Sequence, residues 1–139
     1  ASTAPKFPLA YGDAEHGSIM AFKIVEKDGK PVPEAAWISR DMHVPEPPVI
    51  ANGIVFSIAS GEYVEQVDEN GKLMDSQTRA ERKISDAILY AFDAATGKEL
   101  WNSGKAMTAF THFGGLAVAN GRIFVTTYDG TLYAFSPEQ

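Results

Sequence analysis

Residues 88–102 read Ile-Leu-Tyr-Ala-Phe-Asp-Ala-Ala-Thr-Gly-Lys-Glu-Leu-Trp-Asn, and this stretch decides the fold. Its first five residues recur as Thr-Leu-Tyr-Ala-Phe at 131–135 and as Ser-Ile-Met-Ala-Phe at 18–22. Apolar side chains on both faces of such a segment indicate a strand that is covered from both sides. The recurrence predicts a repeat protein in which similar sheets cover one another.

A second repeated block carries hairpin turns. Val-Ile-Ala-Asn-Gly-Ile-Val-Phe at 49–56 reappears as Ala-Val-Ala-Asn-Gly-Arg-Ile-Phe at 117–124. Asn-Gly and Asp-Gly pairs favour tight turns, because both central residues must tolerate positive φ. The sequence therefore predicts strands at 48–51, 54–59, 88–92, 99–102, 123–128 and 131–135.

The spacing of the repeats is unequal because one unit carries an insertion at residues 60–87. Without it the period is about 43–45 residues, the length of a four-stranded unit. Within the insertion, residues 77–84 are expected to form a short helix capped by Asp75 or Ser76. A loop of this length in a compact domain is more often functional or disordered than neutral, so the insertion is either a lid or partner-binding hairpin or a solvated elaboration.

One stretch resembles the tryptophan-docking motif of quinoprotein-type (PQQ-repeat) β-propellers. The matching residues are Ala91, Asp93, Thr96, Gly97 and Trp101. The resemblance implies an all-β fold: a partial β-propeller of about two and a half four-stranded antiparallel blades. In physical terms, Asp93 can accept hydrogen bonds from turn amides and Gly97 can adopt the left-handed conformation. Trp101 is then expected to lie flat against the neighbouring blade.

An N-terminal copy of the motif departs from this pattern. Ala21 and Trp37 are farther apart than Ala91 and Trp101, with Asp28-Gly29 at the turn between them. A longer hairpin is therefore expected there, with Trp37 still docking.

The chain is expected to be one piece of a single propeller domain, residues 1–139, with blade units at 6–42, 43–106 and 107–139. It is expected to begin within a blade around residues 6–12 and to end after the third strand of a blade. Its partners would be the remaining blades of a larger propeller or copies of itself, since a lone piece exposes two apolar faces.

Composition narrows the classes of partner. The chain has 45% apolar and 22% charged residues, a net charge of −6 and no cysteine. The negative charge argues against nucleic acid, and no stretch approaches the length of a membrane span. Lack of cysteine excludes disulfides and thiolate zinc sites, and it fits bacterial periplasmic proteins as well as cytosolic ones. We expect a periplasmic or extracellular location for a bacterial repeat protein of this kind.

The three histidines, His16, His43 and His112, fall in turns and connections that emerge on one face of a propeller. They are the candidate functional residues: they line an axial site, or each packs against a loop. Because no zinc-type spacing and no catalytic set stands out, we predict neither a metal site nor catalytic residues in this chain.

Two functions are consistent with the sequence. The first is a non-catalytic module that serves as a protein-interaction or assembly scaffold, with the insertion at 61–86 contacting the partner. The alternative, implied by the resemblance, is the C-terminal segment of a PQQ- and calcium-dependent dehydrogenase that oxidises alcohols or sugars. In that case Glu46, Asp86 and Asp129 lie on the appropriate face for calcium, although the vicinal cysteine pair of many such enzymes is missing. PQQ and calcium are expected only if a longer parent is an enzyme.

Overall fold

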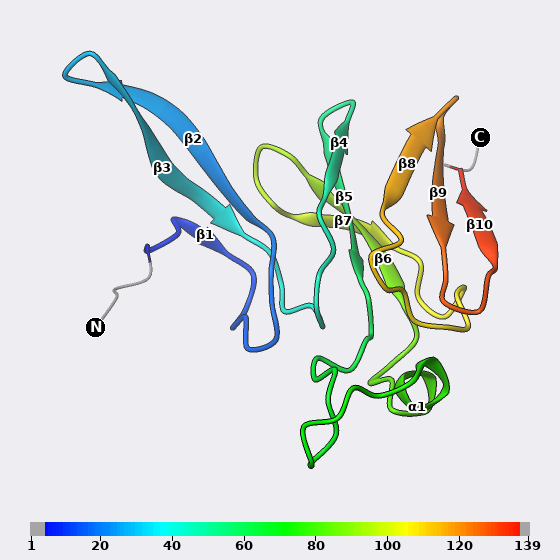
Figure 1. Ribbon diagram of the computed structural model, residues 1–139. Helices are drawn as coiled ribbons and strands as arrows, with labels where there is room; N and C mark the ends of the chain where they lie inside the picture. Colours follow the sequence, from blue (N-terminus) through cyan, green and yellow to red (C-terminus); the bar gives the residue numbers. More distant parts are fainter. Residues whose placement is uncertain (1–4, 137–139) are drawn as a thin grey trace.

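The computed structural model describes residues 5–136, and this part of the chain is mostly β-structure in three small sheets with one short helix (Figure 1). The first sheet has the order β1-β3-β2 and the middle sheet the order β4-β5-β6-β7. The third sheet has the order β8-β9-β10. Within residues 5–136 the sheets do not close into a ring. The strands are β1 (Leu9–Ala10), β2 (Met20–Lys27), β3 (Lys30–Ile38), β4 (Val49–Ala51), β5 (Ile54–Ala59), β6 (Ile88–Asp93), β7 (Glu99–Asn102), β8 (Leu116–Ala119), β9 (Arg122–Thr126) and β10 (Leu132–Phe135).

The middle sheet is the four-stranded antiparallel unit that the sequence predicts. Strands β5 and β7 have the predicted bounds, and β4 and β6 differ from them by one residue. The predicted turn between β4 and β5 is confirmed, since Asn52 and Gly53 both have positive φ, 50° and 74°. The equivalent pair Asn120 and Gly121 repeats this geometry between β8 and β9, with φ of 51° and 71°.

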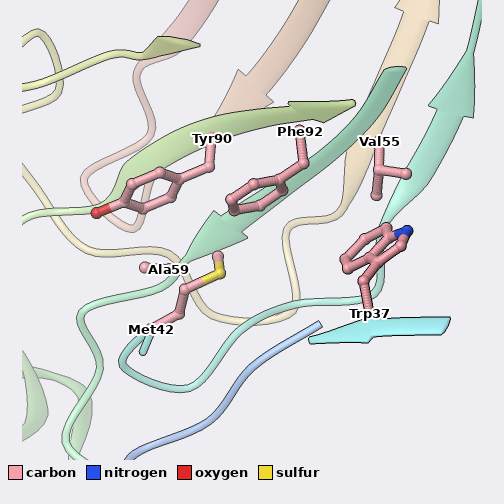
Figure 2. Packing of buried hydrophobic residues seen from close by; sticks show 6 residues of the cluster. All are labelled: Trp37, Met42, Val55, Ala59, Tyr90 and Phe92. Carbon is pink, nitrogen blue, oxygen red and sulfur yellow. The ribbon is translucent and has the colours of Figure 1, made fainter. Parts of the chain in front are cut away.

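The middle sheet is covered on both faces, as its apolar pattern predicts. One face packs against the first sheet through the docking cluster, which consists of Trp37, Met42, Val55, Ala59, Tyr90 and Phe92 (Figure 2). The other face packs against the third sheet through Ile58, Ala87, Leu89, Met107, Ile123 and Val125. Contact between β4 and β8 also brings the first strands of these two sheets together.

Within the described residues, the third sheet has three strands and the middle sheet has four. Strand β9 stops at Thr126, although the sequence predicts a strand to residue 128. The reason lies in the turn: the Thr127 amide donates to the Thr131 carbonyl at 3.0 Å, and the Thr127 hydroxyl donates to Asp129 at 2.7 Å. Thr127 therefore belongs to the turn.

The first sheet contains the longer hairpin expected from the wide spacing of Ala21 and Trp37. Strands β2 and β3 pair over their whole length around the Asp28-Gly29 turn. The prediction of antiparallel pairing throughout is wrong for β1, which pairs with β3 in parallel, Leu9 opposite Trp37. Tyr11 holds the segment there, because its amide donates to Ile38 and its hydroxyl donates to the Thr96 carbonyl at 3.0 Å.

The insertion forms the predicted helix with different bounds. Helix α1 (Ser76–Glu81) is capped by Asp75, whose side chain accepts from the Thr78 amide at 2.8 Å. It ends earlier than residue 84, because the Ile84 and Ser85 amides both donate to the Gly61 carbonyl and bring the chain back to the start of the insertion. In the described part of the chain, no helix has the length and apolar character needed to cross a membrane.

Candidate functional site

Three connections meet at one end of the sheets: the loop after β3, the insertion after β5 and the loop after β7 (Figure 1). Backbone hydrogen bonds hold them together. The Glu46 amide donates to the Ile58 carbonyl at 2.9 Å, which fixes the first loop against β5. The Thr111 amide donates to the Ser60 carbonyl at 3.0 Å, which fixes the last loop against the start of the insertion.

A buried ionic cluster joins the insertion to the loop after β7. Arg79 of α1 forms an ion pair with Glu62, and the Nδ1 atom of His112 lies 2.9 Å from Glu62 Oε2 and 3.2 Å from Arg79 Nη2. The exposed fractions of the side chains are 11% for Glu62, 14% for Arg79 and 23% for His112. Burial, with the charge of Arg79 as a second cause, lowers the pKa of His112. The cluster therefore attaches the helix to the third connection.

Beside this cluster lies a second buried carboxylate, that of Glu46, which is 5% exposed. Its Oε2 accepts from the Gly115 amide at 3.0 Å, whereas its buried Oε1 has no hydrogen-bond partner. Glu46 and Glu62 both line a cavity of about 130 Å³, which we call the acidic cavity. Its lining consists of Val44, Pro45, Glu46, Pro47, Ser60, Glu62, Val64, Gln66 and Phe113.

The structure brings two of the three histidines together. The rings of His16 and His43 lie in contact, with centroids 4.1 Å apart and planes tilted by 32°, and His16 Nδ1 lies 2.7 Å from Asp41 Oδ2. The bond from the His16 amide, followed by this side-chain contact, lowers the pKa of Asp41. His112 has its own partners, Glu62 and Arg79, in the insertion.

The three carboxylates considered for calcium have different surroundings. Asp86 pairs with Lys83, and Asp129 accepts from Thr127 and from the Thr131 amide. Glu46 lies in the acidic cavity. Across residues 5–136, no group of three or more His, Cys, Asp or Glu side chains is arranged to hold a metal ion.

Part of the docking motif lies at the contact between the first and middle sheets. The indole nitrogen of Trp37 donates to the Ala94 carbonyl at 2.9 Å, and its ring lies directly against Gly97. Asp93 accepts from the Ala95 and Thr96 amides and the Thr96 hydroxyl, and these bonds, with the hydroxyl first, lower its pKa.

The other members of the motif have different surroundings. Ala91 is buried in β6, and Ala21 packs against the docking cluster. Trp101 contacts the third sheet: it is 44% exposed, and it meets Phe135 of β10 edge-on, not flat as expected, with ring centroids 5.7 Å apart.

A larger hollow of about 450 Å³ runs between the first and middle sheets beside Gly97. Three of its charged groups have partners: Arg40 binds Glu99 at 3.2 Å, and Asp41 binds His16. The Arg40 guanidinium also lies 5.1 Å from the centre of the Tyr90 ring. The two contacts of Arg40 hold the sheets together, so we assign this hollow a structural role.

Sequence reasoning did not single out Glu62. The only sequence signal for Glu62 is its position: it is a charged residue that comes soon after the buried strand β5 and next to a glycine. Phe113 precedes the pair Gly114-Gly115, and it is 81% exposed with φ of 51°.

The comparisons with known proteins point to the repeat family. Residues 85–139, which contain β6 to β10, match the family model described as outer membrane protein assembly factor BamB, a PQQ-repeat model. The predicted resemblance to PQQ repeats is confirmed for this segment. Comparison with curated proteins and with solved structures gives no match.

Proposed function

We propose that this chain is part of a β-propeller and that it serves as a non-catalytic protein-interaction or assembly scaffold. The three sheets act as successive blades in this proposal. The packing of Trp37 on the Ala94–Gly97 turn, the contact between β4 and β8, and the match at residues 85–139 support it.

The insertion carries the functional part of the proposal. Its exposed large apolar residues are Val64, Val67, Leu73 and Ile84. None of them belongs to a named strand, so the sheets do not require them. Val67 and Leu73 are paired across an isolated antiparallel bridge. Neighbouring exposed apolar side chains are typical of a protein-interaction surface. The ionic cluster supports this role, because it holds the insertion in one position and reduces the entropy lost on binding.

Two further surfaces favour other blades, or copies of this chain, as neighbours. Strand β2 exposes Met20, Phe22 and Ile24, and the third sheet leaves Trp101 and Leu132 partly uncovered. Sheets of this kind are stable when another sheet covers them. Light scattering across a dilution series should show association, and a monomer at every concentration would contradict this part.

The location proposed is the bacterial envelope, on its periplasmic side. The support is the name of the matched family model, which refers to assembly of outer membrane proteins. The partner is then a protein of the same compartment.

A binding experiment tests the scaffold role. Cross-linking and recovery from periplasmic extract should yield a partner with the natural sequence, and less of it with the double substitution V67S/L73S. I50S is the matched control, because Ile50 is 68% exposed, similar to Leu73, but lies on β4. Equal recovery with V67S/L73S would contradict the proposal. Reduction of a dye by the full-length protein after addition of PQQ and Ca²⁺ would also contradict it, in favour of the dehydrogenase.

A further inference from the structure

We propose that the acidic cavity binds one lysine side chain of a protein partner, with Glu46 as the residue that contacts its ammonium group. This inference rests on the proposed scaffold function and names the chemistry that the partner presents. It goes beyond the insertion surface, because Glu46 lies in a different connection, between β3 and β4.

The charges around the cavity are not balanced, because one of its two carboxylates lacks a cationic partner. Of the two carboxylates in the lining, Glu62 is paired with Arg79 and His112. Glu46 has no cationic partner within 4.0 Å in the described part of the chain, and its Oε1 is buried without a hydrogen bond. Burial lowers the pKa of His112, which disfavours a positive charge on its ring. A buried carboxylate is strongly disfavoured unless a cation or a donor reaches it.

The size of the cavity selects a small group. About 130 Å³ is well above the roughly 10–15 Å³ that one water requires. It is also well below the roughly 300–1,000 Å³ of pockets that take whole cofactors or drug-sized ligands. One extended side chain fits this range.

The lining favours lysine over arginine. Val44, Pro45 and Pro47 provide apolar walls for a chain of methylene groups. Within Glu46, Oε2 already accepts from the Gly115 amide, which leaves one oxygen, Oε1, without a hydrogen bond. A guanidinium binds best to two acceptors at once, whereas an ammonium acts as a point charge and needs one.

The rim of the cavity is built for contact with another chain. Phe113 is 81% exposed and Val64 is 70% exposed, and both belong to the lining. Phe113 also has φ of 51°, a backbone conformation that a bulky residue rarely adopts. Strain of this kind at an exposed aromatic residue is typical of binding sites. The rim is therefore suited to the partner residues that flank the lysine.

An NMR titration tests the inference with a defined probe, Nα-acetyl-lysine methylamide. Saturable shifts are expected at the Gly115 and Phe113 amides, since Gly115 donates to Glu46. The neutral norleucine analogue, of similar length, should cause none. Glu46→Gln keeps an acceptor for Gly115 and removes the charge, and it should weaken lysine binding by about tenfold or more.

The control is Glu69→Gln, which removes an exposed carboxylate of the same insertion and should leave binding unchanged. Equal shifts with the norleucine analogue, or unchanged lysine affinity in Glu46→Gln, would overturn the inference. So would Ca²⁺ alone producing the Gly115 shifts and displacing the lysine probe. A natural amide spectrum for Glu46→Gln outside the cavity shows that it is folded.

Failure of this inference is distinguishable from failure of the scaffold proposal. If V67S/L73S, which changes no residue of the cavity lining, abolishes recovery of the partner and Glu46→Gln does not, only the lysine site is refuted. If the lysine probe binds at Glu46 but V67S/L73S leaves recovery unchanged, the insertion surface is refuted and the lysine site stands.

Discussion

Substitution of Gly97 by alanine tests whether the Trp37 contact holds the first sheet to the middle sheet. A Cβ atom built on Gly97 would lie 2.5 Å from two carbons of the Trp37 ring. Gly97 also has φ of 75°. Trp37 is 1% exposed and cannot move aside without leaving the docking cluster and its bond to the Ala94 carbonyl. Alanine at this position is therefore expected to displace the indole.

The size of the effect has two parts. Left-handed backbone costs alanine about 1–2 kcal/mol. Forcing an extra group into a packed core costs a further 1–3 kcal/mol, approximately. The free energy of unfolding should fall by about 2–5 kcal/mol in Gly97→Ala.

A matched glycine separates the two parts. Gly53 has nearly the same φ, 74°, but a Cβ there would have nothing within 4 Å. Gly53→Ala should therefore show only the backbone cost, and both variants gain equally from a stiffer unfolded chain. Urea unfolding, followed by tryptophan fluorescence and by circular dichroism, measures the difference, which should be about 1–3 kcal/mol. Equal destabilisation by the two substitutions would refute the view that Trp37 needs a glycine beneath it.

Three further outcomes are expected. Trp37→Ala should cost about 3–5 kcal/mol in urea unfolding, because the ring is fully buried. Trp101→Ala should cost less, since Trp101 is 44% exposed; the opposite ranking would refute the assignment of the main contact. In an NMR titration, His112 should titrate below its ordinary pKa of 6.5. Its stabilising contribution is therefore complete above pH 6.5 and is lost as the pH falls through the lower folded pKa; a midpoint at or above 6.5 would contradict this. The pKa of Asp93 is also lowered, so the stabilising contribution of Asp93 is present above pH 3.8, its ordinary pKa, and is lost in stronger acid. Asp93→Asn should therefore reduce the loss of stability in acid. An unchanged dependence of stability on acid pH would show that the turn bonds of Asp93 do not matter for stability.

Local signals predicted most of the middle sheet and its turns. Strand bounds at β5 and β7 follow from apolar pattern and turn chemistry, which act over a few residues. Helix α1 was anticipated for the same reason, because Asp75 caps it through the adjacent turn. The end of α1 was missed, since it depends on a bond to Gly61, far away in the sequence.

The candidate site could be predicted only in part. Position in the repeat placed His112 correctly at the end of the sheets where the connections meet. It did not show that Glu62 and Arg79 surround this histidine, because those contacts join residues that are not related by the repeat. The parallel pairing of β1 was missed for a similar reason, since it depends on Tyr11 reaching the Thr96 carbonyl of the next sheet.

By itself, the sequence determined the repeat, the two-sided strands and the motif from Ala91 to Trp101, because each of these is encoded in short-range pattern. Only the tertiary structure decided which buried charges are paired. Glu62 finds Arg79 and His112 across two connections, whereas Glu46 reaches only the Gly115 amide. Pairing of a charge depends on distance in space, and folding sets that distance through contacts that no local pattern records.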